Sequence, residues 1–199
     1  MNHIATALAL CGANEAGDAA SKPDAWRPEL RLLWDRIALH DFEPDQELNF
    51  IGRLARDKSW SLEFARGAVE EYRRFCFLTF SGAGVMTPSE EVDEVWHQHL
   101  TFTRDYWDLW CGSVLRGALH HDPTEGGAAQ DRYFRTRYAA TLAAYERFFG
   151  PPPVQYWPAT HIRFGSGPRF RTIDTAQRFT LPRAATLWRK LRGEARRCR

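Results

Sequence analysis

The 199-residue sequence predicts an all-α protein: a single-domain bundle of five or more helices, followed by an irregular C-terminal arm. Three observations predict this class. Apolar residues recur at the spacing of amphipathic helices in several long segments. Residues that cap or end helices (serine, threonine, glycine and proline) stand at the ends of those segments. Short alternating runs typical of strands begin only near residue 163.

The first three helices are predicted from apolar spacing. A helix is expected near 26–40, and its apolar residues recur at helical intervals: Trp26, Leu30, Leu33, Trp34 and Ile37. The segment 40–45 interrupts that pattern, and Asp45 is a candidate N-cap for the second helix. The third helix is expected to begin after Ser59 or Ser61, since either serine can cap it.

The fourth helix, expected over 88–111, is the best-marked element of the sequence. Thr87 is its candidate N-cap, Pro88 suits the first helical position, and Glu90 completes a capping box. Gly112 is its expected end, because glycine readily adopts the left-handed conformation beyond the last turn. An apolar face carries Val92, Val95, Trp96, His99, Tyr106 and Trp110, and a polar face carries Asp93, His97, Thr101, Arg104 and Asp108.

The remaining chain changes character twice. Glycines and a proline indicate a loop over 113–127, and a fifth helix is expected over 128–149, ended by glycine and three prolines. The alternating runs of 163–182 predict a small hairpin or an extended arm. We therefore expect a loosely ordered segment over 1–23, a helical domain with its arm over 24–182, and a basic tail over 183–199.

The composition excludes several classes of function. A net charge of +2 implies no general attraction to nucleic acid or to membranes. No segment approaches the roughly 20 apolar residues of a membrane-spanning helix. Neither a GxSxG motif nor a phosphate-binding glycine loop is present. The partner is thus expected to be an unidentified small molecule or protein, and the sequence does not indicate an oligomeric state.

The four cysteines are scattered, without a CxxC pair. Cys76 and Cys111 lie in aromatic helical patterns, where a free cysteine packs as a small hydrophobic residue. The apolar run at 4–11 is short and lacks preceding basic residues, so a signal peptide is not expected. These features predict free thiols and a cytoplasmic location.

Histidines and carboxylates form the densest chemical constellation, on and after the fourth helix. Asp93 and His97 are four residues apart, so their side chains stand one above the other. His97 and His99 diverge by about 200° on a regular helix, which argues against a shared ion. We therefore predict a divalent-metal site between the helix 88–111 and the loop 117–127, made by Asp93 and His97 with His120 or His121.

This donor set suits zinc, iron or manganese, and an open coordination position would allow catalysis. In a metal-dependent enzyme, Glu94 or His99 is the nearest candidate for acid–base work. A different arrangement pairs His99, on the apolar face, with a histidine of the loop. The alternative function is a non-enzymatic interaction module, in which the histidines hold the loop against the helix.

Several motifs resemble one known family: RLARDKSWS, EEYRRFCFL, TPSEEVDEVWHQHL, LHHDPTEGG, FFGPPP and YWP. Over about residues 26–182, the chain resembles the bacterial branch of the glycine-rich domain-containing protein-like family, whose plant members share a VDxVWHxH-type motif. The glycine-rich tail of the plant proteins is missing. The resemblance implies an α-helical domain in which residues 93–99 and 120–121 belong together, and it implies no particular reaction.

Overall fold

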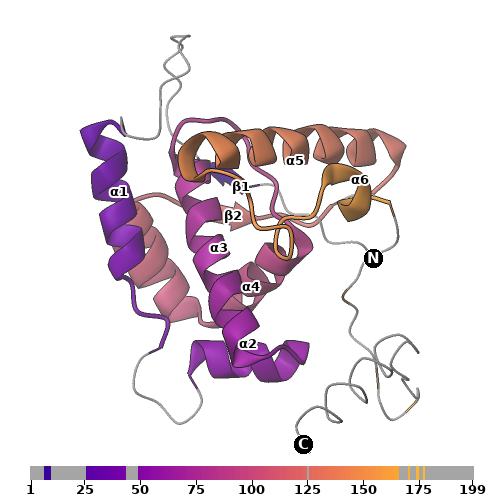
Figure 1. Ribbon diagram of the computed structural model, residues 1–199. Coiled ribbons are helices and arrows are strands. Elements are labelled where there is room, and N and C mark those ends of the chain that lie inside the picture. Colours follow the sequence, from indigo (N-terminus) through magenta and orange to yellow (C-terminus); the bar gives the residue numbers. More distant parts are fainter. Residues whose placement is uncertain are drawn as a thin grey trace, which may run out of the picture. The chain divides into compact units, whose positions relative to one another are not determined.

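The computed structural model describes residues 7–9, 26–43, 49–124, 126–165, 170, 174 and 177. Its elements are, in chain order, β1 (Ala7–Ala9), α1 (Pro28–Leu39), α2 (Phe50–Lys58), α3 (Leu62–Phe80), α4 (Glu90–Thr101), the π-helix η1 (Asp105–Leu115), β2 (Leu119–His121), α5 (Ala128–Phe149) and α6 (Thr160–Arg163) (Figure 1). The predicted all-α class is confirmed.

The chain divides into two compact units, Met1–Arg169 and Phe170–Arg199, and all the named elements belong to the first. The predicted arm or hairpin over 163–182 lies mostly outside the described residues, and the basic tail over 183–199 lies wholly outside them. Within the expected loosely ordered segment 1–23, the structure describes strand β1 alone.

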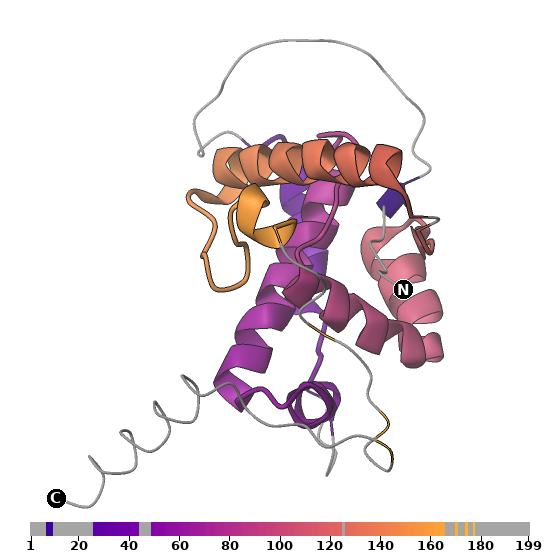
Figure 2. The same ribbon diagram turned by 90° about the vertical axis from the view of Figure 1, so that its right-hand side faces the viewer.

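Helix α3 forms the centre of the first unit. It packs against α1, α2, α4 and α5, and both views show α2 and α5 at opposite ends of it (Figures 1 and 2). A helix covered on most sides must be apolar around most of its circumference. Accordingly, its buried apolar residues are Ala65, Ala68, Val69, Tyr72, Phe75, Cys76, Phe77 and Leu78.

Most of the predicted helices are present. Helix α1 lies within the predicted 26–40, and α5 spans the predicted 128–149. Ser61 caps α3, as one of the two predictions had it, whereas Asn49 rather than Asp45 caps α2. Cys76 and Cys111 are buried free thiols, which confirms that part of the prediction. None of the described helices combines the length and apolar character that crossing a membrane requires.

Helix α4 begins at Glu90, not at Pro88, so the predicted capping box is wrong. The Ser89 hydroxyl accepts a hydrogen bond from the Val92 N–H at 3.2 Å, which makes Ser89 the N-cap. The Thr87 N–H instead donates to the Thr141 hydroxyl of α5 at 2.9 Å. This bond to a distant helix holds Thr87 outside α4, and its own hydroxyl is buried without a hydrogen-bond partner.

The helix predicted over 88–111 is in fact two helices. Phe102, with φ −91° and ψ 59°, leaves the helical conformation and separates α4 from η1. Gly112, the predicted stop, lies inside η1, and Arg116 ends that helix in the left-handed conformation with φ 57°. The apolar spacing continues through Phe102, so it could not reveal the break.

The predicted loop over 117–127 contains a strand. Strand β2 pairs with β1 in antiparallel register, with Ala7 opposite His121 and Leu8 opposite His120. Successive side chains of a strand point to opposite sides. Leu119 is accordingly buried, His120 is exposed and His121 is partly buried.

We predict that Ser89→Ala lowers the free energy of unfolding by about 0.5–2 kcal/mol, because it removes the N-cap of α4. Thr87→Val is the matched control: it replaces an unpartnered buried hydroxyl by a methyl group of similar shape, and it should leave stability unchanged or raised. Urea denaturation of both variants checks the prediction. If Thr87→Val lowers the free energy of unfolding more than Ser89→Ala does, then Thr87 rather than Ser89 is the N-cap of α4.

Candidate metal centres

Helix α4 directs its two histidines to different sides, as their spacing predicts. Each histidine joins a separate group of potential metal ligands. Within the described part of the chain, these groups are Asp93, His97 and His121 on one side, and His40, His99 and Asp105 on the other. We call them the first and the second cluster.

The first cluster lies between α4 and β2. His121 Nε2 lies 3.1 Å from Asp93 Oδ1, at hydrogen-bond distance. His97 Nδ1 lies 3.9 Å from the other carboxylate oxygen, Oδ2, which is too long for a hydrogen bond. The two imidazole rings are adjacent, with centroids 4.3 Å apart. The carboxylate of Asp93 thus turns one oxygen toward each histidine.

Tyr106 of η1 positions the strand that carries His121. Its hydroxyl accepts a hydrogen bond from Trp96 Nε1 at 2.8 Å and donates one to the backbone carbonyl of Leu119. The Trp96 ring in turn packs edge-on against His121, with centroids 4.6 Å apart. Both Tyr106 and Trp96 are completely buried. The start of β2 is therefore tied to α4 through a bonded aromatic pair.

The first cluster is open on one side. The side chains of Asp93 and His121 are 7% and 6% exposed, whereas that of His97 is 33% exposed. Burial lowers the pKa of His97, although the charge of the nearby Asp93 carboxylate acts in the opposite direction. A lowered pKa keeps the imidazole neutral near pH 7, with one ring nitrogen available to a metal ion.

The other two predicted residues near this cluster have different surroundings. His120 is exposed on the opposite face of β2, where its ring lies 5.7 Å from that of Trp107, and it is not a member of the cluster. Glu94 forms an ion pair with Lys58 of α2. Both of these charges act on His97, so the ion pair borders the cluster.

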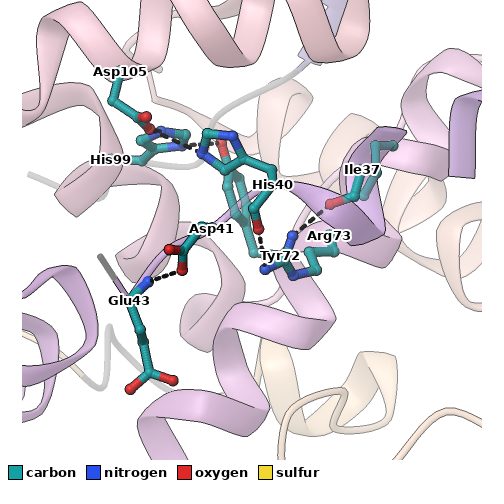
Figure 3. A network of polar contacts seen from close by, with 8 residues as sticks. All are labelled: Ile37, His40, Asp41, Glu43, Tyr72, Arg73, His99 and Asp105. Carbon is teal, nitrogen blue, oxygen red and sulfur yellow. Dashed lines mark hydrogen bonds and ion pairs between the residues drawn. The ribbon is translucent and has the colours of Figure 1, made fainter. Parts of the chain in front are cut away.

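The second cluster lies among α1, α4 and η1 (Figure 3). His99 Nε2 and His40 Nε2 both meet the same oxygen, Asp105 Oδ2, at 2.6 and 3.1 Å. The other ring nitrogen of His99 lies 3.1 Å from the Tyr72 hydroxyl. The arrangement that paired His99 with a histidine of the loop is therefore not formed, because both of its ring nitrogens meet other partners. The His99 side chain is completely buried.

Sequence reasoning missed His40 and Asp105. On a regular helix, six residues correspond to a rotation of about 600°, which leaves the two side chains about 120° apart around the axis. Asp105 meets His99 because the chain turns at Phe102 before η1 begins. His40 comes from the end of α1, and no motif connects it with α4. No local signal could have found either residue.

The second cluster has a strongly perturbed electrostatic environment. Burial among aromatic rings lowers the pKa of His99, although the Asp105 carboxylate acts against this. Burial tends to raise the pKa of Asp105, but hydrogen bonds from His40 and His99 hold it far below its usual range. Asp105 is thus a carboxylate at neutral pH, and it lies between the His40 and His99 rings.

Comparisons of the chain with family models, with curated proteins and with solved structures found no match. The interpretation of the two clusters therefore depends on their own geometry.

Tyr106→Phe should lower the free energy of unfolding by about 1–3 kcal/mol, because it leaves the Trp96 N–H and the Leu119 carbonyl buried without their partner. Tyr133→Phe, which alters an exposed tyrosine, is the control and should have little effect. Chemical denaturation of both variants measures the difference. Equal stabilities would contradict the role given to the Tyr106 hydroxyl.

The stability of the metal-free protein should fall as the pH is lowered from about 7 to 5. The pKa values of His97 and His99 are lower in the folded protein than the value near 6.5 of an unfolded chain. Below about pH 6.5 the unfolded chain binds more protons, so acid favours unfolding. Urea midpoints measured across this range with a chelator present check the sign, and His99→Gln should reduce the slope. A midpoint that rises toward pH 5 would contradict these shifts.

Proposed function

We propose that this protein binds a divalent transition-metal ion between α4 and β2, with Asp93, His97 and His121 as its ligands. The observation that carries the proposal is the convergence of three ligand atoms within 4.8 Å of one another. Two ligand atoms about 2.1 Å from a tetrahedral ion lie roughly 3.4 Å apart. His121 Nε2 lies 3.1 Å from Oδ1 of Asp93 and His97 Nδ1 lies 3.9 Å from Oδ2, so the separations to the two carboxylate oxygens lie on either side of that value.

The donor set favours zinc, iron or manganese. Imidazole nitrogens suit transition metals, and one carboxylate together with two neutral histidines leaves a net positive site that binds water or an anionic group. Three protein ligands leave at least one coordination position open, as in catalytic rather than structural zinc sites. The greater exposure of the His97 side chain supports an open position on that side.

In this proposal the ion acts in a metal-dependent enzyme, with Glu94 as its acid–base group. Glu94 borders the cluster, forms an ion pair with Lys58, and is partly shielded from water. A carboxylate next to a metal-bound water is suited to accept its proton. The His99 ring faces the second cluster, so the same role for His99 is not supported by its position.

A non-enzymatic interaction module is the second candidate function. The bond between His121 and Asp93 and the contact between His121 and Trp96 could attach β2 to α4 without an ion. Kinship with the glycine-rich domain-containing protein-like family, which we also propose from the VDEVWHQHL motif, suits either function. A cytoplasmic location, which we propose from the buried free thiols of Cys76 and Cys111, also suits either function.

The metal content of protein purified without a histidine tag distinguishes the two functions. We expect His97→Ala and His121→Ala each to lower the bound metal by about one equivalent, because either change removes a ligand. His120→Ala is the matched control: it alters the exposed neighbour on β2 and should leave the metal content unchanged. Asp93→Asn should weaken binding less drastically, since an amide oxygen remains.

Stability provides an independent measurement on the same variants. If one ion is lost in each case, the stability losses of His97→Ala and His121→Ala should not add in the double variant. Thermal melts with and without a chelator show whether this holds. A metal-free parent protein, in which the two losses simply add, would contradict the metal site and favour the interaction module.

A further inference from the structure

We infer that His40, His99 and Asp105 form a second, separate binding site for a divalent transition-metal ion. Three segments of the chain bring these ligands together: the end of α1, the last turn of α4 and the first residue of η1. One ligand atom of each lies within 4.8 Å of the others (Figure 3). The donor set, two imidazoles and one carboxylate, is the same as that of the first cluster.

Each histidine of the second cluster is held by groups behind it. The Tyr72 hydroxyl meets the His99 ring nitrogen that faces away from Asp105. Arg73 donates to the backbone carbonyls of Ile37 and His40 at the end of α1, and its charge is paired with Glu70 at 3.0 Å. Metal-binding histidines usually have a hydrogen-bond partner on the second ring nitrogen, which fixes the direction of the ring, and Tyr72 is that partner for His99.

The buried hydrogen bonds of His99 remain satisfied with or without an ion. Without an ion, Nε2–H donates to Asp105, and Nδ1 accepts the Tyr72 hydroxyl proton. With an ion on Nε2, the imidazole proton moves to Nδ1 and donates to the Tyr72 oxygen. The Tyr72 hydroxyl can then donate to the sulfur of Cys76, with which it also interacts. No buried polar atom loses its partner in either state.

An ion requires a small movement, and the structure allows it on one side. The 2.6 Å between His99 Nε2 and Asp105 Oδ2 must lengthen by about 0.8 Å for both atoms to bind one tetrahedral ion. His99 is completely buried, but the Asp105 side chain is 30% exposed. Asp105 is therefore the ligand that moves, and water occupies the remaining coordination positions on its side.

The two sites cannot be one. His97 and His99 point about 200° apart on α4, so one ion cannot bind both. The second site can therefore be measured by itself in the His97→Ala/His121→Ala double variant, which lacks two ligands of the first site. This double variant also separates a failure of the second site from a failure of the first.

The experiment titrates the metal-free double variant with Co²⁺ or Zn²⁺ alone, using calorimetry and the visible spectrum of bound Co²⁺. We expect about one equivalent to bind. Adding Asp105→Asn or His40→Gln should weaken the binding at least tenfold, because each removes a ligand. Asp108→Asn, an exposed carboxylate of the same helix η1, is the matched control and should not change the affinity. Circular dichroism verifies that each variant is folded.

Three results would overturn the inference. The folded double variant binds no metal; or metal binding is unchanged by Asp105→Asn and by His40→Gln; or Asp108→Asn weakens metal binding as much as Asp105→Asn does. The inference is also overturned if the parent protein binds one ion that is lost in His97→Ala but kept in Asp105→Asn. That result would support the first site. The reverse pattern would support the second site and contradict the first.

Discussion

Helix α4 turns by about 100° for each residue, and this rotation determines where its three candidate ligands, Asp93, His97 and His99, point. Asp93 and His97 face β2 from one side of the helix, and His99 faces α1 and η1 from the other. The side of α4 that carries Trp96 is completely buried, so the helix cannot rotate to exchange these positions. Both clusters therefore depend on one constraint, the fixed orientation of α4 in an aromatic core.

Tyr106 connects the two clusters physically. Its ring packs edge-on against His99, with centroids 5.0 Å apart, and its hydroxyl is bonded to the carbonyl of Leu119, two residues before His121. A shift of η1 would thus displace the wall of the second cluster and the strand that supplies the first. Because buried hydrogen-bonding groups are costly to leave without partners, this connection resists separation.

The sequence was informative wherever local spacing decides the structure. The predicted bounds of α5 match the structure, and its C-terminal end follows from the glycine and three prolines after Phe149. The spacing of the histidines on α4 predicted that His97 and His99 point apart. The local sequence pattern gave wrong predictions at Thr87 and at Phe102. At both positions, bonds and packing to distant helices override a pattern that favours a continuous, capped helix. The capping residues predicted at both ends of the long helix were plausible alone, yet neither acts as a cap.

The sequence by itself determined the helical class, the neighbouring positions of Asp93 and His97, and the separation of His97 from His99. These follow from the pitch of one helix and need no other part of the chain. The tertiary structure alone decided that His121 rather than His120 faces Asp93, because the pairing of β1 with β2 sets which side of the strand turns inward. It also decided that His40 and Asp105 meet His99, because that contact requires a break in the helix and a residue 59 positions earlier in the chain. Contacts between segments so far apart leave no periodic pattern, and they form only when the core brings those segments together.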